Sequence, residues 1–191
     1  MAQLYIAFGK EADAIVQIEI IKRLDPLSPL IPKLIARLLY VNGQFANAVE
    51  SASDSLDLEP DNYESLIIYG AAKAELGFYK EALDAFERSM ERNFNLEALS
   101  MKGYVYARML DHTSCQNVLS EIKRHEKPGF MHSIKYAKIA LAKQDLASTF
   151  DLLDQAVSEH DADIVALKCD PRWKEIRDKK QFLQILSSVG L

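Results

Sequence analysis

The sequence predicts an all-α protein: a right-handed α-solenoid of antiparallel helix pairs with a capping helix at its C-terminal end. The prediction depends on a repeat that glycine, alanine and proline all follow. A spacing of 34 residues, or twice 34, joins three sets of positions: Gly9, Gly43 and Gly77; Ala14, Ala48 and Ala82; Pro26, Pro60 and Pro128. This period is typical of helix–turn–helix units that stack against their neighbours and present a surface for partners.

Apolar residues recur at helical spacing within the repeats, and the second repeat shows the pattern clearly. Its first stripe is Leu34, Ile35, Leu38 and Leu39, and after a break at Gly43 its second stripe is Phe45, Ala48, Val49, Ala52 and Leu56. We therefore expect two helices joined by a turn in each repeat. The expected repeat boundaries are 1–28, 29–62, 63–95, 96–129 and 130–163.

Proline and small residues indicate how the helices are joined and packed. Pro60 lacks an N–H and ends one helix, and Asp61 or Asn62 can cap the next. Antiparallel helices approach closely only where side chains are small, as expected at Gly70 and Ala82. The positions expected to carry the repeat structure are Gly43, Ala48, Pro60, Gly70, Gly77, Ala82 and Gly103.

The fourth and fifth repeats depart from the pattern. Asp111 and Gln144 stand near where glycine is expected, and Cys115 replaces the alanine if the register slips by one residue. We expect a repeat array over 1–163, and over 164–191 a loop, a short helical turn and a last amphipathic helix. The apolar residues expected to cover the end of the stack are Trp173, Ile176, Phe182, Ile185 and Leu186.

Composition limits the class of protein. The chain has 191 residues, is 49% hydrophobic and 27% charged, and carries a net charge of −5, which argues against a nucleic-acid or membrane-surface binder. No apolar run is long enough to span a membrane. Early acidic residues and the lack of a basic region argue against a secretory signal. Cys115 and Cys169 have no motif spacing, so we expect reduced thiols in a cytoplasmic protein.

No motif for catalysis, a cofactor or a metal is found. The four histidines are isolated from one another, and only His112 and Cys115 have a spacing that could hold half a zinc site. No other ligands for such a site are evident. The glycines stand alone at turns and form no phosphate-binding loop. We therefore expect a protein that is not an enzyme and that binds neither cofactor nor metal.

The second and third repeats resemble the tetratricopeptide repeat family, through GQFANAVE…SLDLEP and YGAAKAELGFYKEALDAFERSM. The whole chain is also similar to C-terminal repeat domains of bacterial signalling proteins, which follow winged-helix transcription factors, adenylate cyclases or protein kinases. That likeness rests on LDPLSP near the start and DPRW near the end, and DKKQF at 178–182 departs from it modestly. The register places Met1 inside a first helix, so we expect a truncated first repeat and a fragment of a longer protein.

The resemblance implies that the first helix of each repeat lines a concave face that binds a partner protein or peptide. The residues it places there, and that we select as partner-binding, are Lys33, Arg37, Tyr40, Ile67, Tyr104, Arg108 and Lys138. An extended acidic or aromatic peptide would suit Arg37, Arg108 and Lys138. The Lys–Asn combination that clamps the C-terminal carboxylate of heat-shock chaperones is not present.

Two functions are consistent with these features. The first is a non-catalytic interaction module, the sensory or scaffolding end of a cytoplasmic bacterial regulator, with no direct contact to nucleic acid or membrane. The second is self-association, in which the array sets the oligomeric state of a larger signalling protein. The residues expected to matter for self-association are Phe94, Phe130 and Trp173.

Overall fold

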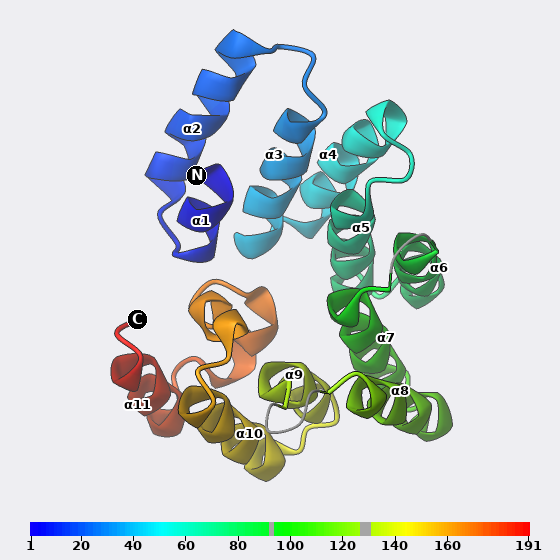
Figure 1. Cartoon of the computed structure of the whole chain (residues 1–191), viewed down its shortest axis with the longest axis vertical. Coiled ribbons are helices and arrows are strands. Elements are labelled where there is room, and N and C mark those ends of the chain that lie inside the picture. The colour runs from blue at the N-terminus through cyan, green and yellow to red at the C-terminus, as the bar shows by residue number, and fades with distance from the viewer. Residues whose placement is uncertain (92–93, 127–130) are drawn as a thin grey trace. The chain divides into compact units, whose positions relative to one another are not determined.

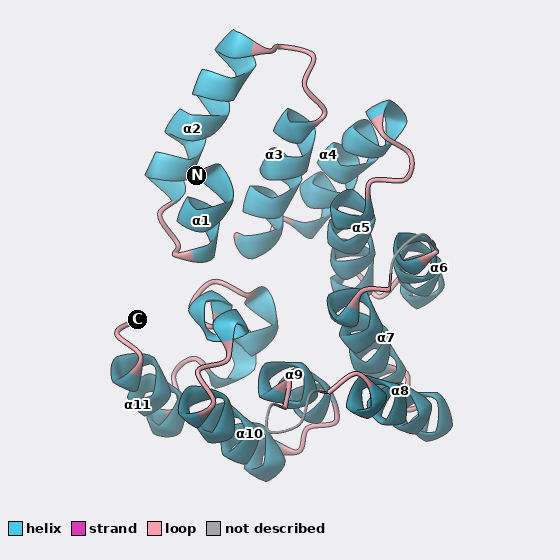
Figure 2. Cartoon of the chain, viewed as in Figure 1, coloured by secondary structure: helices cyan, strands magenta, loops and turns pink. Residues whose placement is uncertain are grey.

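The structure, a computed structural model, describes residues 1–91, 94–126 and 131–191. Within these ranges all regular structure is helical and no strand occurs, as the sequence predicts (Figures 1 and 2). The elements are α1 (Ala2–Ala7), α2 (Glu11–Leu24), α3 (Leu30–Val41), α4 (Phe45–Leu58), α5 (Tyr63–Glu75), α6 (Tyr79–Met90), α7 (Leu96–Arg108), α8 (His112–Arg124), α9 (Ser133–Ala142), α10 (Leu146–Ser158), the 3-10 helices η1 (Ala162–Ala166) and η2 (Pro171–Ile176), and α11 (Lys180–Ser188).

The chain divides into two compact units, Met1–Asn95 and Leu96–Leu191. The first unit contains the pairs α1/α2, α3/α4 and α5/α6, and the second contains α7/α8, α9/α10, the two 3-10 helices and α11. In both units the first helix of a pair also contacts the first helix of the next pair, as α3 contacts α5 and α7 contacts α9. The helix pairs fall within the repeat boundaries expected from the sequence.

Small residues lie at several contacts between helices. Ala48 and Ala82 have no exposed surface. A Cβ added at Gly70 would lie 2.6 Å from Cε1 of Phe86, which is itself completely buried. In the second unit a Cβ at Gly103 would lie 2.5 Å from Cδ1 of Ile139. These glycines therefore lie where helices pack closely.

The turns between paired helices require a left-handed backbone. Gly43 and Gly77 have φ values of 73° and 83°, which glycine adopts without steric cost. In the fourth repeat Leu110 takes this position with φ 60°, whereas Asp111 accepts a hydrogen bond from the backbone N–H of Ser114 as the N-cap of α8. The left-handed position therefore moves one residue earlier in the fourth repeat. The fifth repeat keeps this shift, because Gln144, 34 residues after Leu110, has φ 62°.

The same slip places Cys115 at the alanine position, where it is completely buried. Between repeats, Pro60 lies in the loop from α4 to α5, and the side chain of Asn62 accepts a hydrogen bond of 3.1 Å from the backbone N–H of Ser65. Asn62, rather than Asp61, is thus the cap of α5. Pro128 lies outside the described residues.

The C-terminal segment completes the core of the second unit. Trp173 and Phe182 lie with ring centroids 6.3 Å apart among buried residues of α9 and α10. Every apolar residue predicted to cover the end of the stack belongs to this cluster, with Leu186 partly buried at its edge. No helix in the described ranges is long and apolar enough to cross a membrane.

Candidate partner-binding surface

In the first unit, side chains from α1, α3 and α5 converge on Glu64. Lys33 Nζ lies 2.6 Å from Glu64 Oε2, and Gln3 Nε2 donates to the same oxygen at 3.4 Å. Arg37, one turn after Lys33, adds a second positive charge near this carboxylate. Ile67, one turn after Glu64 on α5, is partly buried. We call these five residues the first-helix face, because each comes from the first helix of its pair.

The charges of the first-helix face determine the state of Glu64. Burial by itself would raise the pKa of Glu64, but the hydrogen bond and charge of Lys33, together with the charge of Arg37, hold that pKa below its ordinary value. Glu64 is therefore ionised at neutral pH and neutralises one of the two cations. The three charged groups sum to +1.

Arg37 differs from the other charged groups of this face. Its side chain is partly buried, and its Nε is sealed from solvent without a hydrogen-bond partner among the described residues. Within the same residues it forms no ion pair, whereas Lys33 is paired at 2.6 Å. Tyr40, also predicted to bind a partner, is only 8% exposed, and its ring packs 5.7 Å from that of Phe45.

In the second unit, the predicted partner-binding residues of α7 contact each other. Arg108 Nη1 donates to the hydroxyl of Tyr104 at 2.9 Å, and its guanidinium carbon lies 5.7 Å from the centre of the Tyr104 ring. Tyr104 is 4% exposed, whereas Arg108 is exposed. Arg108 is therefore held by its own helix.

Lys138, predicted to bind a partner, is a buried member of a charge cluster in the second unit. Its Nζ lies 3.1 Å from Glu97 Oε1 and 3.8 Å from Asp170 Oδ2. Lys135, on the same face of α9, lies 3.1 Å from Glu97 and 2.6 Å from Asp163. Both lysines are less than a tenth exposed.

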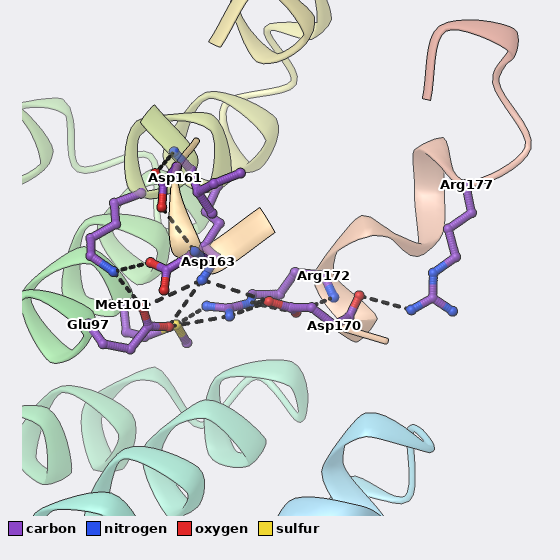
Figure 3. Close-up of polar contacts among 10 residues, drawn as sticks. Glu97, Met101, Asp161, Asp163, Asp170, Arg172 and Arg177 are labelled. Atoms are coloured by element: carbon purple, nitrogen blue, oxygen red, sulfur yellow. Dashed lines mark hydrogen bonds and ion pairs between the residues drawn. The ribbon is translucent and has the colours of Figure 1, made fainter. Parts of the chain in front are cut away.

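Three members of this charge cluster, Asp163, Asp170 and Arg172, come from η1, η2 and the turn between them, and Figure 3 shows them close to Glu97 and Met101. Arg172 pairs with Asp170 and lies 3.4 Å from Glu97, and its Nη1 contacts the sulfur of Met101. The backbone carbonyl of Asp170 accepts a hydrogen bond of 2.9 Å from Arg177. The η1–η2 segment thus covers the first-helix positions of α7 and α9.

Two further contacts fix this segment at the start of α9. Asp161 Oδ2 accepts a hydrogen bond of 3.3 Å from the backbone N–H of Ile134, and the hydroxyl of Ser133 donates to Glu159 at 2.8 Å. Asp161, the N-cap of η1, and Glu159, at the end of α10, therefore satisfy polar groups at the N-terminus of α9.

The cations and carboxylates of the charge cluster keep one another ionised, although several of them are buried. Burial would raise the pKa values of Glu97 and Asp170, but Lys138, Arg172 and, for Glu97, Lys135 hold both below their ordinary values. Burial would lower the pKa of Lys135, but Glu97 and Asp163 raise it. Three cations face three carboxylates, so the cluster is neutral overall. Each of its three cations lies against at least one carboxylate of the same unit.

Sequence reasoning found only Lys138 of this cluster. The remaining members, Glu97, Lys135, Asp163, Asp170 and Arg172, were not predicted to act together. The available signal was the DPRW motif, whose charges could have been assigned to pair with the lysines of α9.

The described residues show no metal site. No group of three or more metal-ligating side chains occurs in them. Of the two residues with half-site spacing, His112 is exposed, whereas Cys115 is buried with its thiol 3.8 Å from the carbonyl of Gly103. Burial raises the pKa of the Cys115 thiol, which keeps it protonated and disfavours its use as a ligand.

No family model matches the chain. Its fold is similar to that of a solved tetratricopeptide repeat protein from Parabacteroides merdae ATCC 43184, with a TM-score of 0.53 over 99% of this chain and 71% of that one. The sequence identity is 16%, so the likeness concerns the fold. The fold class predicted from the 34-residue period, a solenoid of antiparallel helix pairs, is thereby confirmed.

Proposed function

We propose that this chain is a non-catalytic interaction module that binds a segment of a partner protein on the concave side of its helix pairs. Tetratricopeptide-like folds are generally protein-interaction scaffolds rather than enzymes. The observation that carries the proposal is the first-helix face, where side chains from three successive helix pairs meet. The face combines charged groups with the partly buried Ile67, a mixture that suits a protein partner.

We place the module in a cytoplasmic bacterial regulator, as its sensory or scaffolding end. Support for this context comes from the LDPLSP and DPRW sequences and their likeness to C-terminal domains of winged-helix regulators and adenylate cyclases. Partner binding would act on such an output domain only if the partner bound two states of the regulator with different affinities. The net charge of −5 disfavours direct contact of this region with nucleic acid or an anionic membrane.

A pull-down from bacterial cytosol tests the proposal. The bait is the chain, and the variant carries Arg37→Glu and Ile67→Asp on the first-helix face. The matched control is Lys80→Glu, a charge reversal at an exposed position of α6 in the same unit. We expect a protein retained by wild type and by the control and lost by the variant, with equal circular dichroism for all three. Partners retained equally by all three would refute the face as the binding site.

Self-association is the second candidate. It is favoured by apolar side chains exposed on α2, where Ile15, Val16 and Ile20 are each more than two-fifths exposed. Of the residues expected from the sequence, Phe94 is 45% exposed, Trp173 is buried in the core, and Phe130 lies outside the described residues. Sedimentation velocity over a range of concentrations decides between a monomer and an oligomer, and Val16→Glu should dissociate an oligomer formed through α2.

A further inference from the structure

Three cations were expected to suit an extended acidic or aromatic peptide: Arg37, Arg108 and Lys138. In the structure, two of these cations contact partners within the chain. Lys138 is buried against Glu97 and Asp170, and Arg108 binds the hydroxyl and ring of Tyr104. Arg37 alone of the three has no hydrogen bond or ion pair among the residues that the structure describes.

The Nε of Arg37 is a buried hydrogen-bond donor without a partner among the described residues, which is unfavourable. A buried donor without a partner loses its hydrogen bonds to water and gains none in return. Functional sites often keep groups that lower the stability of the free protein, because a bound ligand supplies the missing hydrogen bonds. The state of Arg37 in the isolated chain therefore points to a missing partner.

The charge of the surroundings specifies that partner. The first-helix face has two cations and one carboxylate, whereas the charge cluster of the second unit has three of each. A further carboxylate would neutralise the first-helix face. It would also match the planar fork of Arg37 and accept hydrogen bonds from Nε and one Nη together.

The side chain is able to make that contact. Because no described residue holds the guanidinium, turning it outward breaks no internal hydrogen bond. Lys33, one turn earlier on α3, is already committed to Glu64 and stays in place. Ile67 on α5 offers partly buried apolar surface for a residue flanking the carboxylate.

We propose that Arg37 is the anchor for an Asp or Glu side chain of an extended partner segment, which binds along α3 and α5 with an apolar neighbour on Ile67. This inference rests on the proposed function and specifies the chemistry of the partner. It also restricts acidic recognition to the first unit, since the C-terminal segment already neutralises the lysines of the second.

Selection from a random twelve-residue peptide phage library tests both the proposed interaction module and the role of Arg37 within it. We expect wild type to enrich peptides that share an Asp or Glu beside an apolar residue. A synthetic peptide of the enriched sequence should bind Arg37→Gln about ten to a hundred times more weakly than wild type. Arg37→Lys keeps the charge but lacks the fork, so it should fall between them. Lys80→Gln, the exposed control on α6, should bind as wild type does.

The outcomes separate the two proposals. Enrichment of acidic peptides whose binding is lost in Arg37→Gln but kept in Lys80→Gln supports both. Enrichment of peptides without a shared acidic residue, or binding unchanged by Arg37→Gln, overturns the role of Arg37 and leaves the interaction module standing. If wild type enriches no peptide, the proposed function fails as well. Equal melting temperatures of the variants, measured by circular dichroism, exclude misfolding as the cause of lost binding.

Discussion

Gly70→Ala tests the packing between α5 and α6. The new Cβ would lie 2.6 Å from Cε1 of Phe86, well inside the roughly 3.5–4.0 Å at which carbon atoms normally meet. Phe86 has no exposed surface, so its ring has little room to move. Overpacking of this kind costs about 1–3 kcal/mol, and we expect the upper end here. Alanine regains about 1 kcal/mol through its higher helix propensity, which leaves a net loss of about 2 kcal/mol.

Urea unfolding followed by circular dichroism measures this loss, and a second background identifies its cause. In a Phe86→Leu chain the contact is removed, so Gly70→Ala should become neutral or stabilising. The matched control is Gly43→Ala, where nothing lies within 4 Å of the new Cβ but φ is 73°. Its cost of about 1–2 kcal/mol comes from backbone strain and should be the same in both backgrounds. Equal effects of Gly70→Ala with and without Phe86 would show that the contact does not limit packing.

Three further predictions concern the second unit. Arg172→Met leaves the buried carboxylate of Asp170 with the more distant Lys138 and the backbone N–H of residue 172 as partners, and should lower the free energy of unfolding by about 2–4 kcal/mol in the same assay. The pKa values of Glu97 and Asp170 are lowered in the folded state, so their contribution to the free energy of unfolding is present above about pH 4.5 and is lost as the pH falls further. The pKa of Lys135 is raised, so its contribution is present below its ordinary pKa of 10.5 and is lost as the pH rises above it. Melting temperatures should therefore be flat near neutral pH, and the acid limb should be shallower in Arg172→Met. Leu110→Gly relieves a left-handed leucine and should stabilise by about 1 kcal/mol, whereas a loss would show that the exposed side chain contributes packing.

The repeat could be predicted from sequence because its constraints are local. A glycine with positive φ, a small residue at a close approach and a cap after a proline each act within a few positions. The same rules fail at Asp111, because the fourth repeat places its left-handed residue at Leu110, and leucine gives no signal for that conformation. Cys115 did carry the signal, since only a slip of one residue places it in the buried alanine position.

The candidate surface could be predicted only in part, because the availability of a charge depends on distant residues. The spacing that selected Lys138 places it on α9, the first helix of its pair. Whether that lysine is open to a partner is decided by Glu97, 41 residues earlier, and by Asp170 in the C-terminal segment. No periodicity within one repeat contains this information.

The segment from η1 to α11 has two roles, of which the sequence predicted only the first, an apolar cap. Its apolar residues cover α9 and α10, as expected of a cap, and its charged residues neutralise the two lysines of α9. Trp173 and Ile176 are buried beside Arg172, so covering the core and pairing the charges are parts of a single contact. A partner that competed for Lys138 would have to expose that core, whereas a partner for Arg37 displaces nothing within the first unit. This difference in cost is the physical reason to seek acidic recognition on α3 and α5.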